Sequence, residues 1–266
     1  MGLYFEERGN KEAPTIVLIH GGGVAGWMWG KQVEYLKDYH CIIPDLPEHG
    51  KSIDERPLTI QDCTARIARL IEEKANGGKA HIVGHSLGGK IAVDLIAARP
   101  DLVQSAVVAS ALFRPMRMLK AMHKPYVYKM TVGMIRSKTI LKMLIKKFQF
   151  PDSIYNENCM KDFQSLTADM LFREYDALYQ NLKLPDGLEK ANIPVLVLAG
   201  EKELNAMRES VKDIVRAIPG AKGAYVVKGD HTYPWSMYEG FNQIIHSWIT
   251  EQNVSSSMVN VISGID

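Results

Sequence analysis

The sequence predicts an α/β protein built on a doubly wound, mostly parallel β-sheet. Short β-branched runs alternate with segments of helical period, and most of the runs are apolar on both faces, as strands are when helices cover both sides of a sheet. The alternation stops between Ser110 and Pro194, where the residues indicate several amphipathic helices and no strand. This gap predicts a helical insertion over the edge of the sheet.

The predicted elements follow one another in a regular order. Strands are expected at residues 15–20, 41–45, 80–84, 103–110, 194–200 and 223–229. Helices are expected at residues 26–39, 60–74, 88–99, 206–218 and 236–251. Residues 252–266 are predicted to form a weakly ordered tail.

Length and composition favour one large domain with an insertion. The chain has 266 residues and 46% are apolar, which is enough for one sizeable core. The 32 Lys and Arg nearly balance the 30 Asp and Glu, which argues against a nucleic-acid partner. The cysteines Cys41, Cys63 and Cys159 are odd in number and widely spaced, so we expect neither a disulfide framework nor a structural zinc site. The acidic beginning and the absence of a long apolar run predict a cytoplasmic protein with no integral membrane span.

A candidate nucleophile lies in the segment "VGHSLGG". Gly84, Ser86 and Gly88 form a G-x-S-x-G pattern, with an apolar strand before it and a helix-forming segment after it. A serine on a sharp turn between strand and helix is exposed, and the glycines two positions away on each side allow neighbouring backbone to approach. The alternative is a glycine-rich turn that only links two elements. The flanking segments favour the nucleophile.

A serine hydroxyl needs a base to remove its proton, and that base needs an acid to fix its tautomer. Among the eight histidines, His231 follows the last predicted strand and is therefore expected at the same sheet edge as Ser86. His49, in the loop after the strand at 41–45, is the second candidate. For the acid, Glu203 lies three residues beyond the glycine that ends the strand at 194–200, and Glu201 and Asp230 remain alternatives.

The run "HGGG" at 20–23 predicts the binding of a negative oxygen. Negative charge collects on oxygen when serine attacks an acyl carbon, and backbone amides directed at that oxygen stabilise it. Glycines leave such amides unobstructed, so the expected donors are the N–H groups of Gly22 and Leu87. The alternatives are a flexible turn between strand and helix and a phosphate-binding loop, but no Lys-Ser or Lys-Thr pair follows the glycines to support the second.

These motifs together resemble the α/β-hydrolase superfamily. The segments "HGGGVAGWMW", "PDLPEHGKS", "GHSLGG", "GEKE" and "GDH" occur in the family order, and the resemblance covers about residues 3–250. It implies an eight-stranded sheet, a helical cap between strands 6 and 7, and a triad of Ser86, Glu203 and His231. More loosely, "HGGGVAGWMWGKQ" together with "GHSLGG" resembles the carboxylesterase and methylesterase branches, although most relatives have Asp where Glu203 stands. The predicted division is a core of residues 1–112 and 186–251, a cap at 113–185 and the tail at 252–266.

The insertion is basic and rich in methionine. Residues 113–151 contain ten Lys or Arg and no Asp or Glu, and eight of the 13 methionines lie in the insertion. Amphipathic helices with one solvated face would explain this composition. The alternative is an apolar pocket under a basic rim that attracts anionic substrates or an anionic lipid surface. The predicted substrate-binding residues are Gly23, Trp27, Met116, Met122 and Met130.

The sequence therefore predicts a serine hydrolase that needs no metal and no cofactor. Its expected partner is a small-molecule carboxylic ester with a small or medium apolar part, cleaved through an acyl-enzyme. Thioesters, lactones and carbon–carbon bonds remain open, because the same groups can attack them. A ligand receptor with little or no turnover and a lyase that uses the triad as a proton shuttle are further alternatives.

Overall fold

The computed structural model describes residues 2–254 and 257–262 of the chain. Its centre is an eight-stranded sheet in the order β1-β3-β2-β4-β5-β6-β7-β8. The strands are β1 (Phe5–Gly9), β2 (Thr15–Ile19), β3 (His40–Pro44), β4 (Ala80–His85), β5 (Val103–Ala109), β6 (Val195–Gly200), β7 (Lys222–Val226) and β8 (Val259–Val261). In this order the six inner strands, β3, β2, β4, β5, β6 and β7, are parallel to one another. The outer strands β1 and β8 pair antiparallel at the two edges. The predicted fold class is confirmed.

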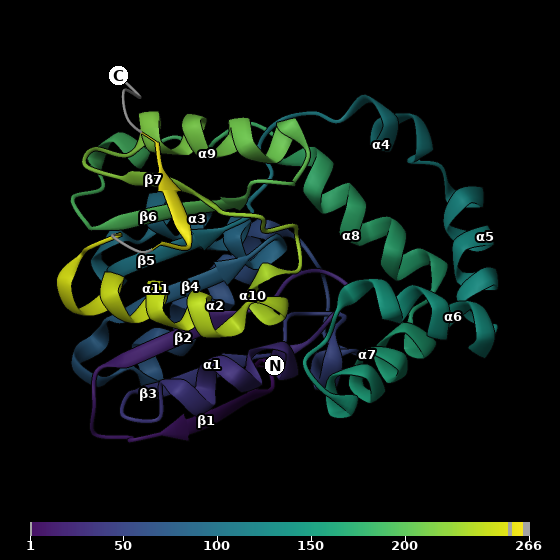
Figure 1. The fold of residues 1–266 in the computed structure, drawn as a ribbon, viewed down its shortest axis with the longest axis horizontal. Helices are drawn as coiled ribbons and strands as arrows, with labels where there is room; N and C mark the ends of the chain where they lie inside the picture. Colours follow the sequence, from purple (N-terminus) through teal and green to yellow (C-terminus); the bar gives the residue numbers. More distant parts are fainter. Residues whose placement is uncertain (1, 255–256, 263–266) are drawn as a thin grey trace.

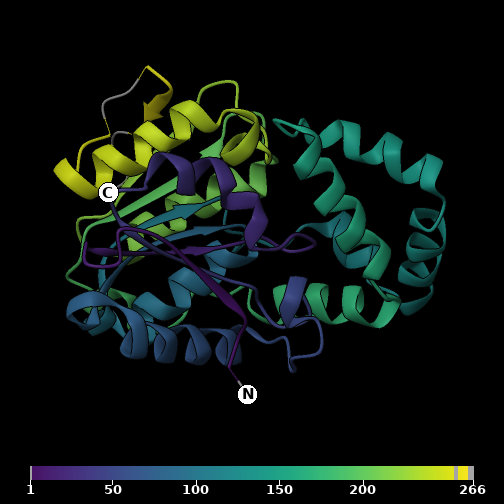
Figure 2. The same cartoon turned by 90° about the horizontal axis from the view of Figure 1, so that it is seen from below.

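Helices cover both faces of the sheet. In the core they are α1 (Gly30–Tyr35), α2 (Ile60–Lys74), α3 (Leu87–Ala98), α9 (Asn205–Ala217), α10 (Tyr233–Ser236) and α11 (Tyr238–Glu251). Short 3₁₀ helices occupy Gly26–Trp29, Gly50–Ser52, Asn76–Gly78, Pro100–Leu102, Lys146–Phe148 and Leu188–Lys190. In Figure 2 the sheet is seen nearly edge-on, with α11 on one side and α2 on the other. None of the helices in the described ranges has the length and apolar character needed to cross a membrane.

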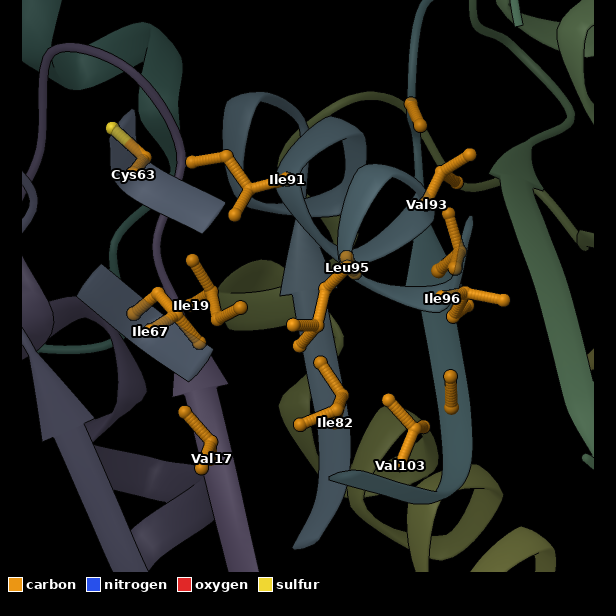
Figure 3. Packing of buried hydrophobic residues seen from close by; sticks show 14 of the residues in the cluster. Val17, Ile19, Cys63, Ile67, Ile82, Ile91, Val93, Leu95, Ile96 and Val103 are labelled. Carbon is orange, nitrogen blue, oxygen red and sulfur yellow. The ribbon is translucent and has the colours of Figure 1, made fainter. Parts of the chain in front are cut away.

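Alternate side chains of each central strand pack into two separate cores. Val17 and Ile19 of β2 join α2 and α3 on one face, whereas Ile16 and Leu18 join the α11 side. Figure 3 shows the first core, where side chains of α3 such as Leu95 lie over β2 and β4. Burying a side chain of this size contributes roughly 1.5–3 kcal/mol. Strands that are apolar on both faces are thus explained by helices on both sides.

The insertion forms a helical cap at one end of the sheet (Figure 1). Its helices are α4 (Arg117–Met122), α5 (Pro125–Ile135), α6 (Lys138–Ile145), α7 (Ser153–Ser165) and α8 (Ala168–Gln180). They have a small core of their own, formed around Leu141, Ile145 and Cys159. The cap lies between β5 and β6 in the numbering used here, whereas the prediction placed it between strands 6 and 7. The strand numbers before the cap are one lower than predicted because a single strand, β1, precedes β2.

A buried lysine joins the cap to the core. Lys90 of α3 is 1% exposed, and its Nζ donates hydrogen bonds to the carbonyl oxygens of Leu112, before the cap, and Asn181, after it. The same Nζ lies 3.8 Å from the centre of the Phe113 ring. Burial lowers the pKa of Lys90 to about 7. The two chain segments that carry the cap thus meet at one side chain of the helix that follows Ser86.

The end of the chain differs from the prediction of a weakly ordered tail at 252–266. Val259–Val261 forms β8, in which Val259 is paired with Val226 of β7 and is buried. This strand satisfies backbone groups along the outer edge of β7, which would otherwise need water. The run is too short to be recognised as a strand from its periodicity alone. The rest of the prediction falls partly outside the described residues, at 255–256 and 263–266.

Candidate active site

Ser86 lies on a strained turn between β4 and α3. Its φ of 55° and ψ of −111° are rare for a residue with a side chain. Close backbone contacts surround the turn: a Cβ on Gly84 would lie 2.3 Å from the Gly88 carbonyl oxygen, and one on Gly88 would lie 2.2 Å from that of Ile19. Only glycine fits at these two positions. The packing therefore explains the G-x-S-x-G spacing.

The structure brings Ser86, His231 and Glu203 together. The Ser86 Oγ lies 3.2 Å from Nε2 of His231, and Nδ1 of the same ring contacts Oε1 of Glu203. A carboxylate can only accept, so Nδ1 carries the hydrogen and Nε2 presents a lone pair to the serine hydroxyl. This tautomer can accept the serine proton.

Glu203 is held in place by two further donors. Its Oε2 accepts hydrogen bonds from the Ser110 hydroxyl at 2.9 Å and from the Gly200 amide at 2.7 Å. The Glu203 side chain is 2% exposed, whereas that of His231 is 46% exposed. The longer glutamate side chain reaches the histidine by folding back onto the end of β6. The imidazole is therefore fixed on its buried side and open to solvent on the other.

The two alternative acids have other partners. Glu201 accepts from the Lys228 amide at 2.9 Å and from the Asn260 side chain at 3.0 Å, next to β8. Asp230 accepts from the amide and hydroxyl of Thr232. Although Asp230 is adjacent to His231 in sequence, its carboxylate stabilises the turn that follows. Neither acid contacts the His231 ring in the hydrogen bonds of the structure.

His85 contacts the loop that carries His231. Its Nε2 donates to the backbone oxygen of His231 at 3.1 Å, and the two rings are 4.7 Å apart. Burial and the nearby His231 hold the pKa of His85 well below its usual range, so the ring stays neutral. The hydrogen bond connects the end of β4 directly to the loop that carries His231.

The glycine run after β2 approaches both Ser86 and the cap. A Cβ on Gly21 would lie 3.4 Å from Cβ of Ser86, and one on Gly22 would lie 2.0 Å from Oε1 of Glu174. Leu87 is the first residue of α3, so its amide is among those that a helix leaves without an internal acceptor. The predicted oxyanion donors Gly22 and Leu87 thus directly follow Gly21, whose backbone approaches the serine, and Ser86 itself.

Glu174, which was not predicted as a site residue from the sequence, is a buried acid of the cap. It lies on α8 and is 7% exposed, and its Oε2 lies 3.4 Å from Nε2 of His49. The His49 ring also contacts the Pro47 carbonyl through Nδ1 and the Gly23 amide through Nε2. One signal could have found this acid: Met170, Glu174 and Ala177 recur at helical spacing on the buried face of α8.

His49 and Glu174 share an interaction that favours the protonated imidazole. Since a carbonyl oxygen cannot donate, the Pro47 contact places a hydrogen on Nδ1. Nε2 of the neutral ring accepts from the Gly23 amide, and a second proton on Nε2 would replace that hydrogen bond with one to Glu174. Burial acts to lower the pKa of His49, but the hydrogen bond and charge of Glu174, with smaller contributions from the Pro47 carbonyl and Asp162, raise it above its ordinary value. His20, in contrast, is fully buried and its pKa falls to about 3. The second histidine candidate is thus a partner of the cap, not of Ser86.

A cavity of about 420 Å³ lies beside the glycine run. Its lining includes Gly23, Trp27, His49 and Asp162, and Trp27 Nε1 donates to Asp162 at 2.6 Å. Ser86, Glu203 and His231 are not among its lining residues. Gly23 and Trp27, both predicted to bind substrate, therefore meet in one cavity, which extends from the glycine run toward α7.

The three predicted substrate-binding methionines do not line this cavity. Met122 and Met130 are 49% and 64% exposed, and Met116 is partly exposed just before α4. The prediction assumed that methionine in the insertion packs inward. On α5 the inward positions belong instead to Tyr128 and Ile135. Methionine content alone does not distinguish the two faces of a helix.

Comparisons with known proteins agree with this architecture. Residues 16–244 match the sequence model of the family described as "Alpha/beta hydrolase family". An AB hydrolase superfamily protein from Gibberella zeae is 41% identical over 107 residues, which cover 40% of this chain and 38% of that protein. The (E)-2-((N-methylformamido)methylene)succinate hydrolase of Acinetobacter baylyi is 25% identical over 249 residues, covering 92% of this chain and 93% of that protein.

A solved structure shows the same fold over nearly the whole chain. The enol-lactonase from Burkholderia xenovorans superposes with a TM-score of 0.73 and 20% identity, covering 94% of this chain and 96% of its own. At this level of identity the likeness concerns the fold alone.

Proposed function

The chain belongs to the α/β-hydrolase family, and on that premise we propose that it is a serine hydrolase that cleaves a carboxylic ester. The supporting observation is the contact of His231 with Ser86 on one side and Glu203 on the other, at a turn whose backbone exposes the serine. Nucleophile, base and acid are then held within hydrogen-bond reach of one another, as nucleophilic catalysis requires.

The first half of the reaction forms an acyl-enzyme. His231 Nε2 takes the proton of the Ser86 hydroxyl while Oγ attacks the acyl carbon. The amides of Gly22 and Leu87 donate to the oxygen that becomes negative, a contribution worth about 3–4 kcal/mol per donor in related chemistry. Glu203 stabilises the imidazolium that forms. His231 then protonates the leaving alcohol, which departs.

The second half releases the acid. Because nearly half of the His231 side chain is exposed, water can reach its Nε2. His231 removes a proton from this water, the resulting hydroxide attacks the acyl carbon, and the proton returns to Ser86 as the ester bond to the enzyme breaks. The hydrogen bond from His85 to the His231 backbone holds the base in position throughout both halves.

Covalent labelling tests the nucleophile directly. A serine-reactive fluorophosphonate is expected to add one adduct, located at Ser86 by peptide mapping, and Ser86→Ala is expected to lose at least about 10⁴-fold in kcat. Ser110→Ala serves as the control for labelling, because that hydroxyl is also close to Glu203. An adduct on another residue, or near-normal turnover by Ser86→Ala, would refute the mechanism.

A panel of substrates tests which class of bond the enzyme cleaves. Esters, thioesters, lactones and amides of graded acyl length are compared by kcat/KM, and esters with small or medium apolar groups are expected to be the best substrates. If labelling of Ser86 succeeds but another bond class is cleaved with higher kcat/KM, the nucleophile assignment stands and the ester assignment is wrong.

A further inference from the structure

An apolar ridge lies on the outer side of the cap. Along α5, Tyr128 and Ile135 are buried, whereas Tyr126, Met130 and Met134 recur every four residues on the opposite side and are each more than half exposed. Side chains at this spacing are neighbours on one helix face. A contiguous exposed apolar strip on a folded domain usually marks an interaction surface.

The next helix, α6, also exposes apolar side chains. Leu141 and Ile145 of α6 are buried, while Ile140 and Met143 face outward and are 40% and 66% exposed. Figures 1 and 2 place α5 and α6 at the end of the molecule farthest from the sheet. We name the surface formed by Tyr126, Lys129, Met130, Met134, Lys142 and Met143 the outer cap face.

The chain segment that carries this surface has charged side chains of one sign. Residues 113–151 contain ten Lys or Arg and no Asp or Glu, whereas residues 152–185 contain six Asp or Glu and three Lys or Arg. The positive charge is thus concentrated in the part of the cap that includes α5 and α6. Lys129 and Lys142 are exposed beside the apolar side chains.

We propose that the outer cap face docks on an anionic lipid surface. Methionine and tyrosine side chains enter the headgroup region, and the lysines lie against the lipid phosphates. The apolar side chains and the lysines together favour a lipid surface over other partners. A soluble anion would leave the apolar ridge exposed to water, and an uncharged apolar partner would leave the lysines without compensating charge. The proposal does not depend on which bond the enzyme cleaves.

Vesicle co-sedimentation tests the proposal. The full chain is expected to bind vesicles of equal parts phosphatidylcholine and phosphatidylglycerol at low ionic strength, and to bind pure phosphatidylcholine vesicles at least about tenfold more weakly. The charge-reversing pair Lys129→Glu/Lys142→Glu should weaken binding to the anionic vesicles by more than about tenfold, and about 0.5 M NaCl should do the same to the wild type. The pair Met134→Ser/Met143→Ser should weaken binding about threefold or more, with the salt dependence retained.

The matched control is Lys79→Glu/Lys190→Glu, which makes the same charge change on exposed core residues and should bind as the wild type does. Circular dichroism and thermal unfolding establish that each variant is folded. Equal loss in the control pair, or no binding of the wild type to anionic vesicles, overturns the proposal. Binding to soluble polyglutamate as tight as to vesicles and unchanged by the methionine substitutions also overturns it, in favour of an acidic protein partner.

Discussion

The orientation of the His231 ring depends on the carboxylate of Glu203. Replacing it by the amide in Glu203→Gln should leave the fold intact, because Gln can still accept from Ser110 and Gly200, but kcat should fall by about 10⁴. Steady-state kinetics on an ester measures this loss. Glu201→Gln and Asp230→Asn are the matched controls, since their carboxylates bind other groups. If Glu203→Gln stays active and one of the controls loses most of its kcat, the residue changed in that control is the acid of the triad.

Glu174 should stabilise the fold in a pH-dependent way. The pKa of His49 is raised above 6.5 by its partner, so the pair stabilises the folded state below that pH and loses this contribution as pH rises through the raised value. Glu174→Gln should therefore lower the free energy of unfolding by about 1–2 kcal/mol near pH 6 and by less at alkaline pH. Urea unfolding at several pH values measures the difference.

The matched control for that experiment is Glu157→Gln, an exposed glutamate on α7. It should change the free energy of unfolding little at any pH. If Glu174→Gln lowers the free energy of unfolding equally at acid and alkaline pH, the carboxylate packs against Gly22 but does not stabilise the protonated form of His49.

Residues near the nucleophile were predictable because their signals are local. Ser86 is flanked by glycines that the turn requires, and Glu203 and His231 each follow a strand that ends at the same sheet edge. Glu174 is marked only by its helical spacing with Met170 and Ala177, and this spacing does not indicate its partner His49, which lies in a loop more than a hundred residues earlier. The direction of the methionine side chains was also beyond prediction, since it depends on how α5 and α6 pack on α7 and α8.

At the scale of elements, the turn between β4 and α3 tolerates no extra atom. Gly88→Ala should lower the free energy of unfolding by about 2 kcal/mol or more, because its Cβ meets the rigid backbone of β2. Gly133→Ala, in the exposed interior of α5, has no heavy atom within 4 Å of the new Cβ and should instead stabilise the protein by about 0.5–1 kcal/mol. Thermal or denaturant unfolding of both variants measures the contrast. Equal effects would contradict the packing described for the turn.

The periodicity of the sequence located the central elements well. Residues 60–74 were predicted as a helix and form α2 with those bounds, because Thr59 caps the first turn and an apolar stripe follows. The two edge strands were not identified from their residues. β1 contains Phe5 followed by charged residues, and β8 is three residues long, so neither has an apolar alternation that could be recognised.

At the scale of the whole molecule, Lys90 should make the stability of the protein depend on pH in the alkaline range. Its pKa is about 7 in the folded protein and near 10.5 when exposed, so between these values the unfolded chain binds more protons than the folded one. Stability from this group therefore rises with pH across that window and falls as pH drops through 7. A neutral amine still has two N–H groups for the Leu112 and Asn181 carbonyls.

Comparison with Lys90→Met isolates this effect. The free energy of unfolding of the wild type should rise relative to that of the variant from pH 7 to pH 10, by at most about 4 kcal/mol. Denaturant unfolding across this range gives both curves. Parallel curves would show that the lysine has its ordinary pKa in the folded protein.

The antiparallel strands at the two borders of the sheet limit how copies of the protein can associate. An open border invites the backbone of another chain, and natural proteins discourage such strand addition with charged residues or very short border strands. One border here is β1, with Glu6, Glu7 and Arg8 in succession, and the other is the three-residue β8. Continuous sheets across two molecules, and the fibrous aggregation that begins from them, are therefore disfavoured at both ends. Any self-association of this protein should use helix surfaces.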